Sequence, residues 1–345
     1  MKVLVIADPH IPVPPRTYGG TERIAALTCE TLIALGHTVV LLAGPGSRDY
    51  GGGLTVHRAP TAALSSRGWR KALFLMMTAQ LSADVDLVIC HGRHDYLGAV
   101  IARGVPLLLW FHNPVVQADI DYLLHRGATR VRFVGISQAQ MRGLVPADRI
   151  DIVYNCVDTD GHRFAARPAT PPYVAFLGRL TPNKGVHLAI EAARRAGVPL
   201  VIGGNVTDEP GARAYFESQV RPRLSPDCTW IGPYDDRAKV ALLQGASALL
   251  FPIQWDEPFG LVMIEALACG TPVIAFRRGS TPEVVRHGQT GFLCDTPDEM
   301  SAAVTRVSAL DRAACRRDAE ERFSTAAFRL RLAALCEAAT AGAHR

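Results

Sequence analysis

Lysine is scarce in this 345-residue sequence, which has only four: Lys2, Lys71, Lys184 and Lys239. The net charge is +5, and the arginine pairs at 194–195, 277–278 and 316–317 stand apart from one another without interleaved aromatic residues. We therefore expect no nucleic-acid partner, because a nucleic-acid surface needs clustered basic and aromatic side chains. In a chain with so little lysine, a lysine within a loop is a candidate for a specific role.

Long apolar runs and cysteine motifs are also missing. The sequence contains no run of 18 apolar residues, so it gives no indication of a membrane-spanning helix. The N-terminus, M-K-V-L-V-I-A-D, is too short for a secretory signal and lacks its small-residue cleavage site. The eight cysteines include no C-x-x-C pair, so we expect reduced core thiols and neither a zinc site nor disulfides. On these grounds we expect a cytoplasmic protein.

Short apolar runs alternate with helical patterns along the whole chain, which favours an α/β fold with parallel sheets. The length favours two domains, and we predict doubly wound, Rossmann-like domains over 1–160 and 170–322. The proline-rich stretch 157–172 reads as their linker. We expect the C-terminal helix, 323–345, to pack back on the first domain. Strands are predicted over 2–7, 38–43, 54–58, 86–90, 106–111, 131–136, 150–154, 173–177, 200–203, 229–232, 249–253 and 273–276.

The stretch 251–276 has the strongest pattern, with a buried strand, a polar loop, an apolar helix over 261–268 and another strand. Glu257 lies in the loop and Glu265 lies eight residues later in the helix. Gly260 precedes the helix, whose first N–H groups attract phosphate, and loops of this kind bind ligands in open α/β sheets. Both glutamates could instead be solvated surface charges. Glu265 argues against this, because it interrupts an apolar segment and a buried carboxylate needs partners.

A second candidate loop, G-R-L-T-P-N-K-G over 178–185, follows the predicted strand 173–177. It places Arg179 and Lys184 five residues apart. A diphosphate suits this pair, because Arg offers a bidentate fork and Lys a compact charge. The loop lacks the P-loop pattern, and the alternative is that both are surface bases.

In the first half, Gly19 and Gly20 lie between a strand and a helix, where glycines let the backbone approach a ligand closely. The dinucleotide fingerprint G-x-G-x-x-G is absent, and a tight turn without a ligand is the alternative. His91 and His112 each follow a predicted strand, so they are structural histidines or ligand contacts at the carboxyl edge of the sheet.

The predicted helix 65–81 combines basic and apolar residues. Residues 67–77 could make weak peripheral contact with a membrane surface, although packing against the sheet is the commoner use of such a face. No pattern in the sequence indicates an oligomeric state.

Taken together, these motifs resemble the retaining glycosyltransferases of family GT4, which have the two-domain GT-B fold. The resemblance covers nearly the whole chain. It rests mainly on G-R-L-T-P-N-K-G and on E-P-F-G-L-V-M-I-E-A-L-A-C-G-T-P-V-I-A from Glu257. The motifs W-F-H-N at 110–113, N-C-V-D at 155–158 and T-P-E-V-V-R-H-G-Q-T-G-F-L at 281–293 support it. The chain departs from the family at Ser280, where a second glycine is usual.

The resemblance implies a role for each matching residue. Arg179 and Lys184 would hold the donor diphosphate, Glu257 the donor sugar and Glu265 the ribose, while His112 would lie near the transferred sugar. The base would be held at Ile231 and Gly232, and Gly19 and Gly20 would approach the diphosphate. The implied catalytic residues are Arg179, Lys184, Glu257 and His112. The implied substrate-binding residues are Gly19, Gly20, Asn155, Gly178, Ile231, Gly232, Phe259, Gly260, Leu261, Val262 and Glu265.

The implied reaction moves a sugar from a nucleoside-diphosphate sugar, with UDP-sugar favoured and GDP-sugar an alternative, to a hydroxyl of a small-molecule, glycan or lipid-linked acceptor. Its transition state is oxocarbenium-like. Positive groups at the departing diphosphate would assist the reaction in place of a metal, and no cofactor is expected. The P-P-R-T-Y-G-G-T-E form at 14–22 resembles a branch that includes natural-product enzymes. Two alternatives are a non-hydrolysing sugar-nucleotide epimerase and a non-catalytic sugar-nucleotide-binding protein.

Overall fold

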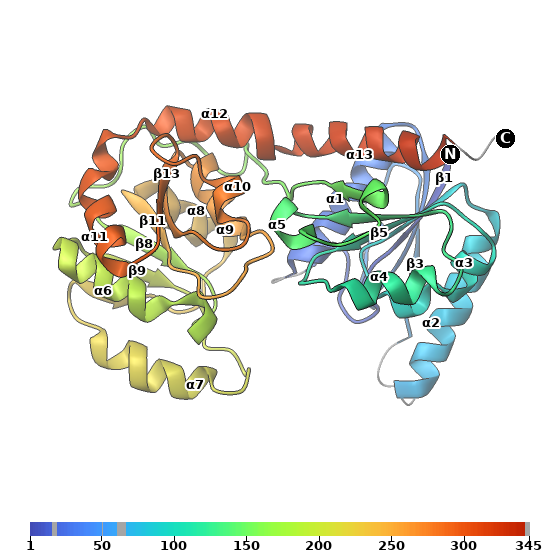
Figure 1. Cartoon of the computed structure of the whole chain (residues 1–345), viewed down its shortest axis with the longest axis horizontal. Coiled ribbons are helices and arrows are strands. Elements are labelled where there is room, and N and C mark those ends of the chain that lie inside the picture. Colours follow the sequence, from blue (N-terminus) through green and yellow to red (C-terminus); the bar gives the residue numbers. More distant parts are fainter. Residues whose placement is uncertain (16–18, 50, 61–66, 342–345) are drawn as a thin grey trace. The chain divides into compact units, whose positions relative to one another are not determined.

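The computed structural model describes residues 1–15, 19–49, 51–60 and 67–341, and the chain forms two compact units (Figure 1). Unit 1 comprises residues 1–154 and 328–345, and unit 2 comprises residues 155–327. The ranges predicted from the sequence, 1–160 and 170–322, differ from these units because the linker and the residues just before 328 belong to unit 2. Each unit contains one parallel sheet with helices around it, so the predicted α/β fold class is confirmed.

Unit 1 is built on a 7-stranded parallel sheet in the order β3-β2-β1-β4-β5-β6-β7. Its strands are β1 (Lys2–Ile6), β2 (Thr38–Ala43), β3 (Leu54–Arg58), β4 (Leu87–Cys90), β5 (Leu107–Phe111), β6 (Val131–Gly135) and β7 (Ile150–Ile152). Its helices are α1 (Gly20–Ala34), α2 (Arg67–Leu81), α3 (Gly98–Ala102), α4 (Gln117–Leu124) and α5 (Gln138–Met141).

Unit 2 repeats this arrangement with a 6-stranded parallel sheet in the order β10-β9-β8-β11-β12-β13. Its strands are β8 (Val174–Leu177), β9 (Leu200–Gly203), β10 (Cys228–Trp230), β11 (Ala248–Phe251), β12 (Val273–Phe276) and β13 (Gly291–Cys294). Its helices are α6 (Val186–Ala196), α7 (Ala212–Tyr215), α8 (Asp236–Gly245), α9 (Leu261–Ala268), α10 (Thr281–Val284), α11 (Pro297–Arg306) and α12 (Arg312–Phe323). The sequence analysis did not predict β13.

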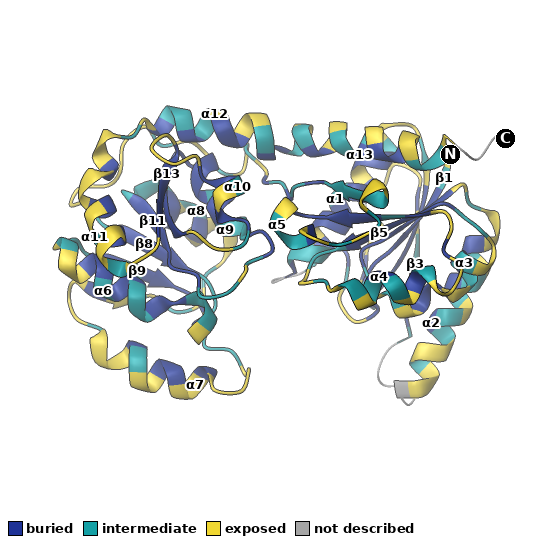
Figure 2. Cartoon of the chain, viewed as in Figure 1, coloured by how far each residue is buried: buried dark blue, intermediate teal, exposed yellow. Residues whose placement is uncertain are grey.

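The central strands are buried along their length (Figure 2). This explains why they read as continuous apolar runs without alternation, since helices cover both faces of a parallel sheet. The last helix, α13 (Thr325–Thr340), buries Phe328, Leu332 and Leu335. Phe328 belongs to unit 1, and its ring centroid lies 5.9 Å from that of Trp110 in β5. The apolar face of α13 therefore completes the core of unit 1.

The strand order places a topological switch point in each sheet. In unit 2 it lies between β8 and β11, which are hydrogen-bonded neighbours although the chain passes through β9 and β10 between them. The loop after β8 carries Arg179 and Lys184, and the loop after β11 carries Glu257. Ligands of doubly wound folds bind at this position, because the loops on its two sides leave a crevice.

These two loops touch. The Gln254 backbone N–H donates to the Asn183 carbonyl at 2.8 Å. Gly185 has φ +72°, and a Cβ at this residue would lie 2.1 Å from the Pro252 carbonyl oxygen. Only glycine satisfies both requirements, the left-handed backbone and the close approach.

We expect the substitution Gly185→Ala to destabilise unit 2 more than Gly197→Ala does. Gly197 has nearly the same backbone angle, φ +66°, but open space around it. Gly197→Ala should cost about 1–2 kcal/mol for the left-handed backbone alone. Gly185→Ala should cost a further 1–3 kcal/mol, roughly, because the added methyl group forces the loops apart. Urea unfolding of both variants measures the difference, and equal losses would show that the loops do not need this contact.

Candidate functional site

Lys184 and Glu257 form an ion pair at the switch point of unit 2. The Lys184 Nζ lies 2.5 Å from the Glu257 Oε2, and the two side chains are only 14% and 12% exposed. The Trp255 Nε1–H donates to the same carboxylate oxygen at 2.8 Å, and the Lys184 Nζ lies 5.5 Å from the Trp255 ring centroid, within the range of cation–π attraction. The structure thus brings the two predicted loops together through their charged residues. Neither Lys184 nor Glu257 is a solvated surface charge.

Glu265 has an equivalent partner in Lys239 of α8. The Lys239 Nζ lies 2.6 Å from the Glu265 Oε1, with side-chain exposures of 11% and 17%, and 3.2 Å from Asp236. Burial acts to lower the pKa of Lys239, but the attraction of Glu265 and Asp236 outweighs it and raises the pKa. The ammonium group therefore stays charged and holds Glu265 in place.

Sequence reasoning missed Lys239, although a usable signal was present. Two of the four lysines in the chain pair with the two spaced glutamates. Scarcity singled out Lys184 because it lies in a loop. Lys239 lies in helix α8, where surface lysines are ordinary, so its partner was visible only in the fold.

Arg179 makes a different contact. Its Nη1 pairs with the Glu209 carboxylate, and about a third of the Arg179 side chain is exposed. The neighbouring Gly178 is part of a close crossing, because a Cβ on Gly204 would lie 1.9 Å from the Gly178 carbonyl oxygen. Arg179 and Lys184 thus leave the same loop toward different carboxylates.

Ser280, which departs from the family pattern, supports the loop that carries Glu257. Ser280 is fully buried. Its N–H donates to the Glu257 carbonyl at 3.0 Å and its Oγ donates to the Phe259 carbonyl at 2.8 Å. The hydroxyl group gives this loop a tether that a glycine could not provide.

The N-terminus of α9 has no side-chain cap. Gly260 has φ +79° and lies immediately before Leu261 and Val262. Because no side-chain cap accepts a hydrogen bond there, the first N–H groups and the positive end of the helix dipole remain available to an anion. Glu257, which pairs with Lys184, precedes Gly260 in the same loop. An anion bound at the start of α9 would therefore lie next to the loop that carries Glu257.

Of the remaining candidates of unit 2, Ile231 and Gly232 follow the end of β10, and Asn155 is the first residue of the unit. Ile231 is about half exposed, and its N–H donates to the Ile202 carbonyl at 3.0 Å. The Gly232 carbonyl accepts from the Gly204 N–H at 2.9 Å. Asn155 is buried, and its Oδ1 has no hydrogen-bond partner within the described part of the chain.

The candidates of unit 1 lie after β1, β4 and β5. Gly19 is buried, and a Cβ there would lie 2.8 Å from both Pro15 and the Glu22 Oε2, so no larger residue fits. Gly20 begins α1. Glu22 is itself buried, and burial raises the pKa of its carboxyl group.

The two histidines of unit 1 contact each other. The His91 Nδ1 lies 2.9 Å from the His112 Nε2, and the His91 Nε2 lies 3.1 Å from the Thr28 Oγ1 in α1. Burial lowers the pKa of His112 to about 3; for His91, burial together with the nearby His112 lowers the pKa well below its ordinary value. Both imidazoles are therefore neutral at physiological pH.

This neutrality predicts a loss of stability in mild acid. The folded-state pKa of His112 is depressed, so its contribution is complete above the unfolded-state pKa of about 6.5 and is lost as the pH falls toward about 3. Between pH 7 and pH 5 the loss should reach about 2 kcal/mol for His112. Urea unfolding should show a weaker pH dependence in His112→Asn than in the wild type, while a His125→Asn control, at an exposed position, should match the wild type. Equal pH dependence in all three would contradict the assignment.

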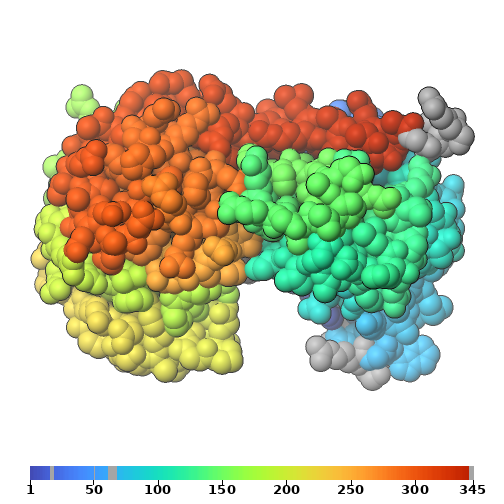
Figure 3. All heavy atoms as spheres, in the orientation of Figure 1, coloured from blue at the N-terminus to red at the C-terminus, as the bar shows by residue number. Residues whose placement is uncertain are grey.

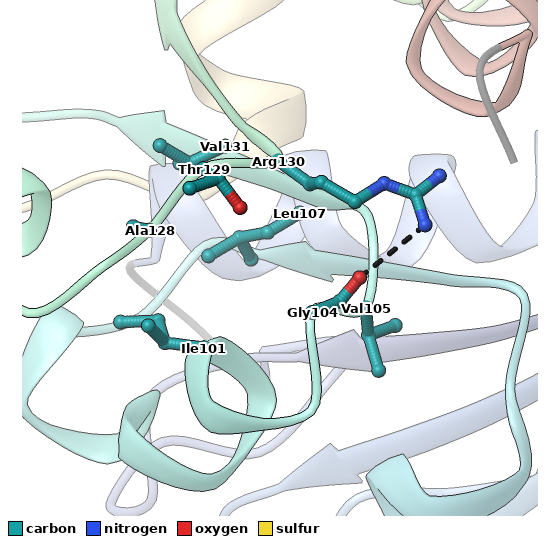
Figure 4. Close-up of a pocket in the computed structure, with 8 residues that line it drawn as sticks. All are labelled: Ile101, Gly104, Val105, Leu107, Ala128, Thr129, Arg130 and Val131. Carbon is teal, nitrogen blue, oxygen red and sulfur yellow. Dashed lines mark hydrogen bonds between the residues drawn. The ribbon is translucent and has the colours of Figure 1, made fainter.

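The small pocket in Figure 4 lies elsewhere in unit 1. Residues of 101–107 and 128–131 line it, and the Arg130 Nη1 donates to the Gly104 carbonyl at 3.3 Å beside it. This is where β5 and β6 begin, whereas His112 follows the end of β5. The pocket therefore contains none of the candidate residues.

Aspartate carboxylates that could hold a metal ion accept hydrogen bonds from other groups of the chain. Three Asp-x-Asp triplets occur, at 84–86, 119–121 and 158–160. Asp84 and Asp86 bind Lys2, Asp119 accepts from the backbone at the start of α4, and Asp158 accepts from the Asp160 N–H. Across the described ranges, no three His, Cys, Asp or Glu side chains gather in a metal-binding arrangement.

Helix α2 packs on its sheet and exposes two large apolar side chains. Phe74 is buried with its ring centroid 4.6 Å from that of Tyr96, whereas Trp69 and Met76 are 64% and 65% exposed. The space-filling view shows α2 at the periphery of unit 1 (Figure 3). Contact of residues 67–77 with a membrane surface stays a prediction. Within the described residues, every helix is too short or too polar to span a bilayer.

Sequence comparison identifies the family. The sequence model for "Glycosyl transferases group 1" matches residues 158–327, and that for "Glycosyltransferase Family 4" matches residues 18–161. The two matches together run from residue 18 to residue 327. The chain therefore belongs to the GT4-type glycosyltransferases with the GT-B fold, as the motifs predicted.

Particular relatives can be named. The chain is 36% identical over 170 residues to the glycogen synthase of Mycobacterium tuberculosis (strain CDC 1551 / Oshkosh), and the match covers 47% of this chain and 40% of that protein, less than half its length. AviGT4, a glycosyltransferase involved in avilamycin A biosynthesis, has a similar fold, with a TM-score of 0.69 and 24% identity. The match covers 99% of this chain and 98% of AviGT4. Anabaena Alr3699/HepE, solved in complex with UDP-glucose, gives a TM-score of 0.72 and 18% identity. That match covers 98% of this chain and 100% of the Anabaena protein.

Proposed function

We propose that this chain transfers a sugar from a nucleoside-diphosphate sugar, a UDP-sugar in the first instance, to a hydroxyl group of an acceptor, with retention of configuration and without a metal ion. The observation that carries the proposal is the pair of lysine–glutamate contacts in unit 2, Lys184–Glu257 at the switch point and Lys239–Glu265 between α8 and α9. Family membership supports the reaction class.

The diphosphate would bind between Lys184, Arg179 and the uncapped start of α9. As the bond to the sugar breaks, negative charge grows on the departing diphosphate, and fixed positive groups stabilise it most at that moment. These groups would take the part that a metal ion plays elsewhere. The acceptor hydroxyl would attack from the same face of the sugar and pass its proton to the departing phosphate.

The two glutamates would recognise hydroxyl groups on either side of the diphosphate. An ionised carboxylate only accepts hydrogen bonds, so it suits a sugar diol and repels phosphate. Glu257 would contact the transferred sugar. Glu265 would contact the ribose, and Lys239 would prevent it from turning away.

The base would lie against Ile231 and Gly232 after β10. Uridine is favoured because a protein of the same fold binds UDP-glucose. For the acceptor, the names of similar proteins include both a glycogen synthase and a glycosyltransferase involved in avilamycin A biosynthesis. We therefore propose an acceptor hydroxyl on a glycan or a natural product.

Lys184→Met should lower turnover of UDP-glucose by about a hundredfold, since removal of one group that stabilises a transition-state charge costs ~3 kcal/mol. Release of UDP in the presence and absence of candidate acceptors provides the assay, and UDP thermal stabilisation measures binding. Lys2→Met is the control, because Lys2 also pairs with a carboxylate, that of Asp84, at the surface. Unchanged turnover in Lys184→Met would refute the diphosphate assignment. An altered sugar nucleotide without any acceptor would indicate epimerisation.

Lys239→Met should weaken UDP binding about tenfold, a change of 1.4 kcal/mol, because Glu265 loses its partner. Inorganic pyrophosphate lacks a ribose, so its affinity should stay the same. Calorimetric titration of both ligands gives the ratio, with Lys239→Arg as the charge-conserving control. A parallel loss for both ligands would mean that Lys239 acts on the phosphates and not through Glu265.

A further inference from the structure

The contact between Arg179 and Glu209 is far more exposed than the other ion pairs of the candidate site. Their side chains are 33% and 46% exposed, whereas those of the two lysine–glutamate pairs are 11% to 17% exposed. An exposed pair contributes little to stability, because water solvates both charges when the pair opens. A pair that is shielded from water leaves an uncompensated charge when one partner is withdrawn. The Arg179 contact is therefore the one that an incoming anion can exchange at low cost.

Glu209 reaches Arg179 from a loop that is held at both ends. The loop follows β9, and its Asn205 carbonyl accepts from the N–H of Leu180, the residue after Arg179, at 3.0 Å. At the other end, the Glu209 carbonyl accepts from the Ala212 N–H at 3.0 Å, where α7 begins. The backbone therefore keeps the Glu209 carboxylate close to the guanidinium even when another anion displaces it.

A carboxylate and a phosphate compete for the same guanidinium donors. Both present oxygen acceptors, and an arginine binds either of them through its planar fork of N–H groups. No carboxylate other than that of Glu209 contacts Arg179 within the described ranges. A diphosphate that binds Arg179 must displace Glu209 or lie beside its negative charge, and Glu209 opposes binding in either case.

We infer that Glu209 is an exchangeable counter-ion of Arg179, which the diphosphate of the substrate displaces and which returns to Arg179 as the nucleoside diphosphate leaves. This inference rests on the proposed function. Negative charge grows on the departing diphosphate, so Arg179 would hold the product more tightly than the substrate. A competing carboxylate beside the site shortens the residence of the product and leaves in place the positive charge that the reaction needs.

The fold supplies a matched control in Glu217, which follows α7. The Arg221 Nη1 lies 2.7 Å from the Glu217 Oε2, and the Glu217 side chain is 41% exposed, close to the 46% of Glu209. Glu217→Gln therefore removes the same charge from the same unit, next to an arginine that the proposed function does not use.

Calorimetric titration with UDP and with inorganic pyrophosphate tests the competition. Glu209→Gln should bind both ligands about two- to fivefold more tightly than the wild type, the range expected for an exposed ion pair that the ligand no longer has to break. UDP should also dissociate more slowly by a similar factor in stopped-flow displacement. Glu217→Gln should match the wild type. Unchanged binding in Glu209→Gln would overturn the inference, and weaker binding would show instead that Glu209 positions Arg179.

A double-mutant comparison separates exchange at Arg179 from general repulsion. In an Arg179→Met background, Glu209→Gln should strengthen binding less than in the wild-type background, because the carboxylate has no guanidinium to occupy. An equal gain in both backgrounds would overturn the exchange. Weaker UDP binding in Arg179→Met, with no gain in Glu209→Gln, would support the diphosphate assignment and refute this inference alone. Failure of the wild type to bind either ligand would refute the proposed function, and this inference with it.

Discussion

The arrangement of unit 2 depends on one partly buried ion pair, that between Lys184 and Glu257. Charges removed from water are stable only when they are paired and hydrogen-bonded, so the loop after β8 and the loop after β11 must meet where each presents its charge. The Trp255 indole N–H donates a second hydrogen bond to the Glu257 carboxylate oxygen that Lys184 contacts. The two loops are therefore matched parts of one structure.

Close backbone packing supports that pair from both sides. Gly185 lets the first loop lie on the Pro252 carbonyl, and a Cβ on Gly279 would lie 2.4 Å from the Glu257 carbonyl oxygen. Ser280 then ties the Glu257 loop to the start of α10. Rigid support of this kind holds charged side chains in position, which sites of electrostatic stabilisation require.

The sequence predicted the parallel α/β architecture and most strands, and for α9 the predicted and observed bounds agree. These elements have long, uniform apolar patterns bounded by glycine or proline. Two elements of four residues, β13 and α10, were missed, and α10 is too short for a helical period to show in its sequence. The partners of Glu265 and His112 were also missed, since Lys239 and His91 are 26 and 21 residues distant along the chain. Such pairs are set by the strand order, which local patterns do not contain.

Unit 1 is completed by a segment that the ribosome makes only after all of unit 2. Phe328 and Leu332 fill its core, yet 173 residues of unit 2, from Asn155 to Ala327, are synthesised before them. Domains usually fold as their segments emerge, the earlier ones first. Until α13 is synthesised, the Trp110 side of the core of unit 1 is uncovered, whereas all residues of unit 2 have already been made and can fold. The first unit to begin synthesis is therefore the last to finish folding, and during that interval its apolar surface is open to chaperones.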